Sequence, residues 1–359
     1  MSQYDEAGRL NKIQTTDQGN VTDIISKINW NGPTMGSYQQ GNGLVTTQSY
    51  DTAGRLTEKQ FGNDNGLQNQ LDNQSQILQQ SWTRNNATEI NNYQYDVLGR
   101  LSQDGSNAEN QFGYDAVGNR LSETQPSTNY GYQNNSNRLS EINGTTIQRD
   151  ATGNTLDDGK NQYQYNAMNR LSGLINSQNN VQASYSYNYQ GQRVRKQLSG
   201  SQNEDIRFVY GLQGELLGEY QANGEIIREY LYQTEHGIAE LVAERTENGS
   251  LMYIHTDHLG TPRIATDQTQ AVVWLWNSDA FGSTEANDDP DGDSNSTTIN
   301  HRFSGQYFDL ESGLNYNYFR YYDPRSGRYV TSDPIGLGGG LNTYGYGCNP
   351  SSAQISNNL

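Results

Sequence analysis

The sequence predicts an all-β protein made of an array of β-hairpins. Three observations support this fold class: a seven-residue pattern recurs, tyrosines alternate with polar residues in front of it, and no segment has a convincing apolar helical period. The pattern reads Tyr-Asp-x-x-Gly-Arg-Leu, and its full copies begin at Tyr4, Tyr50 and Tyr95. A copy with one additional residue begins at Tyr114, and looser copies begin at Tyr132, Arg149, Tyr165, Tyr187 and Tyr210.

Each copy contains the residue types that a strand, a tight turn and a return strand require. In Tyr93-Gln94-Tyr95 the two rings alternate with a polar residue, so both face one side of a strand. The aspartate can cap the turn by accepting hydrogen bonds from backbone N–H groups. The glycine three residues later supplies the positive φ of a type I turn with a bulge, and the arginine can lie on a neighbouring ring. We expect these turn roles for Asp5, Asp51, Asp96 and Asp115 and for Gly8, Gly54, Gly99 and Gly118.

The spacing of the copies predicts stacked hairpins. Between residues 93 and 232 they follow one another every 16 to 23 residues, which suits one hairpin per unit. Single hairpins are marginal, so neighbours must bury the tyrosine and leucine face together. Residues 61–81 are rich in Asn and Gln, and we expect a long turn or an eroded repeat there. Residues 231–245 are the best helical candidate, but Gly237 and β-branched neighbours favour a strand.

Composition excludes several classes of protein. Hydrophobic residues make up 32% of the chain and the mean hydropathy is -0.94, but 26 tyrosines at regular spacing indicate an ordered interior rather than disorder. A net charge of -17 argues against nucleic-acid binding and against docking on an anionic membrane. One cysteine excludes an intrachain disulfide framework. There is no run of 18 apolar residues and no classical signal peptide.

From residue 250 the sequence changes character. Residues 251–263 contain His255-Thr-Asp-His-Leu-Gly-Thr-Pro-Arg263, and residues 313–346 are dense in aromatics, Asp-Pro pairs and glycines. Together with the repeats, these motifs resemble the tyrosine–aspartate repeats and the C-terminal boundary motif of the Rhs family, which is related to the C components of Tc toxins and more distantly to teneurins. The matching residues of the boundary motif include Asp323, Pro324, Asp333, Pro334, Gly336, Leu337, Gly339 and Gly340.

The resemblance implies a spiralling sheet that forms a shell, with the boundary domain inside it as a plug. We therefore expect a repeat array over residues 1–250, a core-associated plug domain over 251–350 and a divergent tail over 351–359. Closed shells of the family use more repeats than this chain has, so we expect an open, partial spiral with exposed edge strands.

In the family a toxin follows the plug, is cut from it by a pair of aspartates and is held in the shell. Asp333 matches the first aspartate, but the second would fall at Ile355, although Leu359 stands where the leucine before the cut would be. An aspartyl protease needs two carboxylates that share a proton. We therefore expect Asp333 to begin a structural turn, and we favour this role over the hypothesis of self-cleavage.

Three further groups are candidates for chemistry. Asp289, Asp291 and Asp293 have the alternating spacing of calcium loops, but the glycine is misplaced, which favours a solvated loop and no cofactor. His255 and His258 flank Asp257, which leaves a metal or acid–base site open beside a packing role. Cys348 has no neighbouring base, which favours an idle thiol.

These observations predict a structural shell and plug fragment of an Rhs-type toxin protein, without an attached toxin. Two alternatives remain: a self-cleaving aspartyl protease, and a glycan-binding or adhesion module that uses exposed Tyr and Trp side chains such as Trp274 and Trp276. The expected partners are parent shell segments or a toxin domain, and secretion-system or delivery proteins. The expected location is the bacterial cytoplasm before export, then the medium or the cell surface. Because the chain opens directly in a repeat, we expect a fragment or the tail of a longer polypeptide.

Overall fold

The structure is a computed structural model that describes residues 1–346 except 18, 85, 106–108 and 236–237. Within these residues the regular elements are strands β1 to β33 and one short 3₁₀ helix, η1 (Gly336–Gly339). No helix in the described part is long and apolar enough to cross a membrane. The predicted all-β class is confirmed, and residues 226–235 and 238–246 form two strands rather than a helix.

The wall consists of three antiparallel sheets in which chain neighbours pair. The first sheet contains β1 (Ser2–Tyr4), β2 (Leu10–Asp17), β3 (Asn20–Asn31), β4 (Thr34–Gln40), β5 (Val45–Tyr50), β6 (Leu56–Phe61), β7 (Asn65–Leu71), β8 (Ile77–Arg84) and β9 (Ala87–Asn92). The second contains β10 (Gln94–Tyr95), β11 (Leu101–Asp104), β12 (Asn110–Tyr114), β13 (Arg120–Thr124), β14 (Ser127–Tyr132), β15 (Leu139–Ile142) and β16 (Thr145–Thr146).

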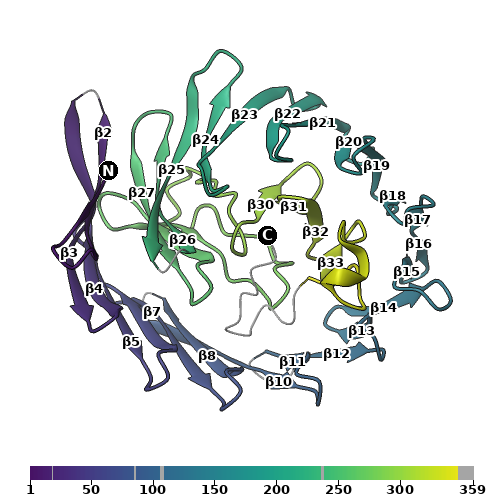
Figure 1. The fold of residues 1–359 in the computed structure, drawn as a ribbon, viewed down its shortest axis with the longest axis horizontal. Helices are drawn as coiled ribbons and strands as arrows, with labels where there is room; N and C mark the ends of the chain where they lie inside the picture. Colours follow the sequence, from purple (N-terminus) through teal and green to yellow (C-terminus); the bar gives the residue numbers. More distant parts are fainter. Residues whose placement is uncertain (18, 85, 106–108, 236–237, 347–359) are drawn as a thin grey trace.

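The third sheet is the longest and carries the wall back to its start. It contains β17 (Gln148–Arg149), β18 (Thr155–Asp157), β19 (Asn161–Tyr165), β20 (Leu171–Asn176), β21 (Val181–Tyr187), β22 (Arg193–Gly200), β23 (Glu204–Tyr210), β24 (Leu216–Gln221), β25 (Ile226–Glu235), β26 (Ile238–Thr246), β27 (Leu251–Thr256), β28 (Pro262–Thr266) and β29 (Val272–Leu275). Figure 1 shows these strands following one another around a ring, with the last ones inside it.

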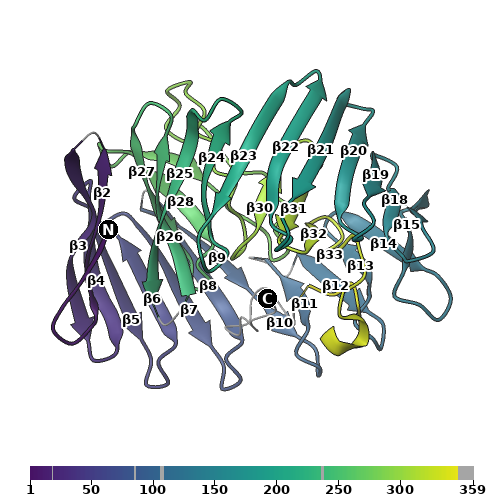
Figure 2. The same cartoon turned by 45° about the horizontal axis from the view of Figure 1, so that its top comes forward.

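The spiral closes by overlap. Strands β25 to β28 lie inside the ring beside the first sheet in both ribbon views (Figures 1 and 2). Phe61, Leu67 and Trp82 of the first sheet bury a common cluster with Ile264 of β28, and Lys59 of β6 pairs with Glu240 of β26 at 2.7 Å. The prediction of an open spiral is therefore wrong. The first sheet and the last strands of the third sheet pack face to face, and this closes the ring without hydrogen bonds between strand edges.

A fourth sheet occupies the interior. It contains β30 (Tyr307–Asp309), β31 (Leu314–Asn317), β32 (Arg320–Asp323) and β33 (Arg328–Tyr329), and Figure 1 shows it enclosed by β19 to β25. Its tyrosines share one buried cluster with inward side chains of the third sheet, among them Tyr163, Tyr185, Phe208, Tyr230, Tyr307, Tyr316, Tyr321 and Tyr322. We call this sheet with residues 326–346 the plug.

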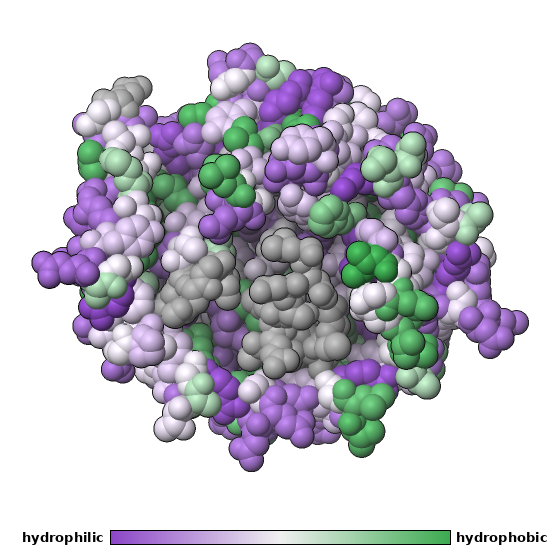
Figure 3. All heavy atoms as spheres, in the orientation of Figure 1, coloured by the Kyte–Doolittle hydropathy of each residue, from purple (hydrophilic) through white to green (hydrophobic). Residues whose placement is uncertain are grey.

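The expected domain boundary at residue 250 does not coincide with the end of the wall. β27 pairs with β26, as Ala243 with Tyr253, and the third sheet runs on to Leu275. The sequence changes character at 250 because the strands become buried on both faces there, and not because the sheet ends. The face of the molecule shown in Figure 3 is largely hydrophilic where it is coloured, with hydrophobic groups in separate places.

Candidate functional site

The repeat turn between β5 and β6 shows what the Tyr-Asp pattern does. Oδ1 of Asp51 accepts hydrogen bonds from the backbone N–H groups of Ala53 and Arg55 at 2.9 and 3.0 Å, and Oδ2 accepts from Nε of Arg55 at 2.7 Å. Gly54 has a φ of +78°, and the strand register shifts at Tyr50. Hydrogen bonding, first from the Arg55 backbone N–H, lowers the pKa of the Asp51 carboxyl. The carboxylate is occupied as a turn cap.

The other full copies repeat this geometry with one variation. Asp5 and Asp96 accept the same three bonds, and Gly8 and Gly99 have φ values of +76°. In the Asp115 turn the amide of Asn119 replaces the guanidinium at 2.8 Å, and Gly118 has a φ of +85°. Arg100 also reaches the next repeat, where its guanidinium carbon lies 4.8 Å from the Tyr114 ring centroid.

The tyrosines connect neighbouring repeats through their hydroxyls. In six units the hydroxyl of the tyrosine that begins the unit donates a hydrogen bond to a backbone carbonyl of the preceding unit. The donor–acceptor distances are 2.6 to 3.0 Å, and the carbonyl always belongs to the sixth residue after the first position of that preceding unit. The pairs are Tyr95 with Ile77, Tyr132 with Arg120, Tyr165 with Thr155, Tyr187 with Leu171, Tyr210 with Arg193 and Tyr232 with Leu216. Sequence reasoning treated these rings only as packing units. The recurrence of tyrosine at the first position of the pattern was the available signal.

Degenerate repeats are also present, one of them within residues 61–81, where we expected a long turn or an eroded repeat. Asp72 caps a turn between β7 and β8, and Ser75 takes the positive φ in place of glycine, at +66°. Asp257 caps the turn between β27 and β28, where Arg263 donates to its Oδ2 at 2.9 Å. An Asp three residues before a Gly, Ser or Asn was the signal that could have found them.

The two histidines beside Asp257 have separate surroundings. The Nε2 atom of His255 lies 3.0 Å from the Thr266 hydroxyl, and its ring contacts Phe61. Burial, with the charge of Lys59, lowers the pKa of His255 to about 3. His258 lines a pocket with a volume of about 30 Å³, and neither of its ring nitrogens has a hydrogen-bond partner. Asp257 is committed to its turn and to Arg263, so the three do not form a metal or acid–base triad.

A buried ionic cluster anchors the plug to the wall. Both terminal nitrogens of Arg193 on β22 donate to the carboxylate of Asp309 on β30, and both side chains are almost completely buried. Lys196 bridges Asp309 and Glu311 at 3.1 and 3.2 Å, and the Tyr185 hydroxyl donates to Glu311 at 2.8 Å. Burial, then the charge of Asp309, raises the pKa of Glu311.

Aromatic rings surround the central guanidinium of this cluster. The Arg193 guanidinium carbon lies 4.5 to 5.9 Å from the centroids of five rings, those of Tyr185, Phe208, Tyr307, Tyr316 and Tyr321. Charges this deep in a protein persist only when they are paired. The plug is therefore held in one orientation by complementary charges from both parts.

Asp333, the expected catalytic aspartate, lies in a turn of the plug. Its backbone N–H donates to the Thr343 carbonyl at 2.7 Å, and its Oδ1 accepts from the Ile335 N–H at 3.0 Å. Its Oδ2 pairs with Arg320 at 3.0 Å. A Cβ on Gly339 would lie only 2.7 Å from this same oxygen, so glycine is needed there. None of these contacts is to a second carboxyl group.

The other boundary-motif residues also build turns. Asp323 accepts from the backbone and Nε of Arg325 at 3.1 and 3.0 Å and from the Ser326 hydroxyl at 2.8 Å. Pro324 lies in this turn and Pro334 in the next, where Gly336 and Gly340 have positive φ and Leu337 is exposed. Cys348, Ile355 and the predicted tail from residue 351 lie outside the described residues.

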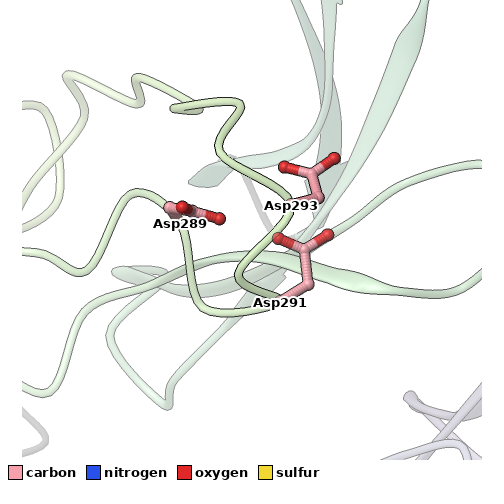
Figure 4. A group of neighbouring side chains, drawn as sticks. All are labelled: Asp289, Asp291 and Asp293. Carbon is pink, nitrogen blue, oxygen red and sulfur yellow. The ribbon is translucent and has the colours of Figure 1, made fainter.

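The acidic loop brings three carboxylates together on the surface. Oxygens of Asp289, Asp291 and Asp293 lie within 4.8 Å of one another (Figure 4). Asp289 is half-buried and accepts from the Ser294 N–H, whereas the other two are exposed. The loop offers three of the six to eight oxygens that calcium takes.

The tryptophans proposed as exposed ligand-binding side chains are in the core. Trp274 is 1% and Trp276 is 0% exposed, and the indole N–H of Trp276 donates to the Thr284 carbonyl at 2.9 Å. Arg302 lies 4.8 Å from the Trp276 ring centroid. The proposal that these two residues bind glycans as exposed side chains is wrong, because both belong to the buried cluster that the third sheet shares with the plug.

Comparison with known proteins agrees with this architecture. The family model described as teneurin YD-shell matches residues 15–337. The double-stranded DNA deaminase toxin A of Burkholderia cenocepacia is 30% identical over 293 residues, which cover 72% of this chain and 20% of the relative. The probable deoxyribonuclease RhsA of Dickeya dadantii is 27% identical over 97% of this chain and 25% of its own length.

A solved structure shows the same fold. The crystal structure of TcdB2-TccC3 without its hypervariable C-terminal region matches 99% of this chain with a TM-score of 0.80 and 19% identity, over 20% of its own chain. This chain thus spans about a fifth to a quarter of the length of these relatives. The chain belongs to the YD-shell family and is an Rhs-type protein related to the Tc toxins.

Proposed function

We propose that this chain is the wall segment and plug of an Rhs-type polymorphic toxin protein, and that its role is to help enclose a toxin domain. The observation that carries the proposal is the buried cluster around Arg193 and Asp309, which fixes a separate sheet inside a spiral of repeats. The toxin-associated relatives support a shell-type role.

Enclosure requires more wall than this chain provides. Two pockets that described residues line between the wall and the central elements have volumes of about 30 and 50 Å³. A small folded domain needs thousands of cubic ångströms, so neither pocket could hold one. We infer that the cargo space is formed jointly with further shell segments of a longer polypeptide.

Protease protection tests this proposal. A protease-sensitive reporter is fused after Leu359, either in this chain alone or in a chain extended before Met1 by the preceding shell repeats of Dickeya RhsA. We expect the reporter to be cut in the first protein and protected in the second. Equal cleavage in both would show that this segment does not complete a shell.

The proposed partners and location follow from this role. A toxin domain and a delivery apparatus would be its partners, as part of an effector that is made in the bacterial cytoplasm and then appears outside the cell. Fractionation of cells that produce the longer polypeptide tests this. Recovery from the cytoplasm alone, under conditions in which other effectors are exported, would contradict it.

A further inference from the structure

A small polar pocket lies between the wall and the plug on the side of β12 to β14. It is lined by residues of the β12–β13 hairpin, by Tyr132 and by plug residues 326–328, 342 and 345. Its volume of about 50 Å³ is room for roughly three water molecules, or for one carboxylate group. It is separate from the Arg193–Asp309 cluster and from Asp333.

Two buried arginines face this pocket, and each has an unsatisfied donor. Arg120 and Arg328 are both only 6% exposed, and the Nε–H of each is buried without a hydrogen-bond partner. Both side chains line this same pocket. Buried donors of charged groups are costly to leave unpaired.

The positive charge at this place is only partly balanced by the described residues. Arg120 pairs with Glu123 at 3.4 Å. Arg328 donates to the Asn137 carbonyl and lies on the rings of Tyr132 and Tyr344, at 5.1 and 4.9 Å from their centroids. Within the ranges that the structure describes, Arg328 forms no ion pair with a carboxylate.

A third arginine adds to this charge. Arg149 lies 5.1 Å from the same Tyr344 ring and donates to the carbonyls of Leu139 and Gly153, again without a carboxylate partner among the described residues. Burial, and then the charge of Arg328, lowers the pKa of Arg149 to about 10, and burial lowers that of Arg328. The chain has many acidic residues, since its net charge is -17. Another buried arginine, Arg193, forms an ion pair with one of them, Asp309.

We propose that this pocket is a carboxylate-binding site, in which Arg328 and Arg120 donate through their free Nε–H groups and the guanidinium of Arg328 supplies the charge. An anion there would satisfy both donors and neutralise the cation that the plug brings against the wall. The carboxylate can come from a small free anion or from the side chain of a peptide that enters the shell. Both sources present the same two oxygens.

Binding to the purified full chain distinguishes these sources. Melting temperature and saturation-transfer NMR are recorded at constant ionic strength while chloride is replaced by acetate, or by N-acetyl-aspartate amide, whose only carboxylate is a side-chain one. Saturable binding of acetate indicates a free anion. Binding of the aspartate derivative alone indicates a peptide carboxylate.

The variants decide where the anion binds. We expect Arg328→Gln to weaken binding roughly tenfold or more, because a charge-assisted contact is lost. Arg195→Gln is the matched control, since Arg195 is 35% exposed and pairs with Asp205 on the outside of the wall, and it should leave binding unchanged. If Arg328→Gln does not fold, Arg328→Lys replaces it. No saturable binding of either probe to the wild type, or equal binding by the Arg328 and Arg195 variants, would overturn the proposal.

Discussion

The hydroxyl of Tyr187 donates a hydrogen bond of 2.6 Å to the backbone carbonyl of Leu171, which belongs to the preceding repeat. The same relationship recurs in five further units, so these hairpins are tied to their neighbours by a side chain in addition to the sheet itself. The ring packs in the interior, and the hydroxyl donates a hydrogen bond to a carbonyl at the start of a strand. A tyrosine can do both, whereas phenylalanine cannot.

Removal of this hydroxyl should therefore cost stability. Tyr187→Phe leaves the Leu171 carbonyl unpaired and also removes the contact with the Tyr321 hydroxyl at 3.0 Å, so we expect a loss of about 1 to 2 kcal/mol in the free energy of unfolding by urea. Tyr4→Phe is the control, because Tyr4 is 59% exposed and begins the first repeat. Equal effects of both changes would refute the inter-repeat role.

Breaking the plug anchor should have a larger effect. Asp309→Asn leaves Arg193 and Lys196 buried without their shared carboxylate, and we expect a loss of about 3 to 5 kcal/mol and protease cleavage within the plug. The exposed pair of Arg207 with Asp205 offers a comparison, since Arg207→Met should cost less than about 1 kcal/mol. An Asp309→Asn protein as stable as the wild type would show that the cluster does not hold the plug.

Acid should destabilise the protein through its buried histidines. The pKa of His255 is about 3 when folded and near its ordinary value of about 6.5 when unfolded. Between these values only the unfolded chain takes up the proton, so stability is present above pH 6.5 and falls by about 1.4 kcal/mol per unit as pH decreases. The free energies of unfolding of the wild type and of His255→Gln, measured at pH 7 and at pH 5, give the contribution of His255. The stability difference between them should shift by about 2 kcal/mol in favour of the variant at pH 5, and a constant difference would contradict the assignment.

Self-cleavage should be absent from this chain. Asp333 is held by Arg320 and by its own turn, and a shared proton needs a second carboxyl group. A tag fused after Leu359 should remain attached, as measured by intact mass. Cleavage after Leu359 that disappears in Asp333→Asn would restore the protease hypothesis.

We expect the acidic loop to have only a low affinity for calcium. With three carboxylates and two exposed members, a dissociation constant below about 0.1 mM is not expected, since tight loops supply more ligands. Calorimetric titration with Ca²⁺ measures it, with Asp291→Asn as the variant. Micromolar binding that Asp291→Asn abolishes would reveal ligands beyond the three aspartates.

The sequence predicted best those interactions that join residues close together in the chain. The turn roles of Asp51 and Gly54 follow from five consecutive residues, because the cap, the positive φ and the return strand lie within one hairpin. The repeat at Asp72 could be expected only as an eroded copy or a long turn, because serine takes the place of the glycine, and the turn at Asp257 was overlooked. The roles of Asp333 and Asp323 in turns were likewise within reach of the sequence.

The sequence by itself determined the repeating unit, the all-β class and the Rhs resemblance, since each is encoded in short periodic motifs. Only the tertiary structure decided that β26 to β28 pack inside the first sheet, that Trp274 and Trp276 are core residues, and that Arg193 meets Asp309 while Arg328 pairs with no carboxylate among the described residues. The physical reason is distance along the chain. The contacts of β26 with the first sheet and of Arg193 with Asp309 join residues more than a hundred positions apart, and small twists summed over many strands decide which of them meet.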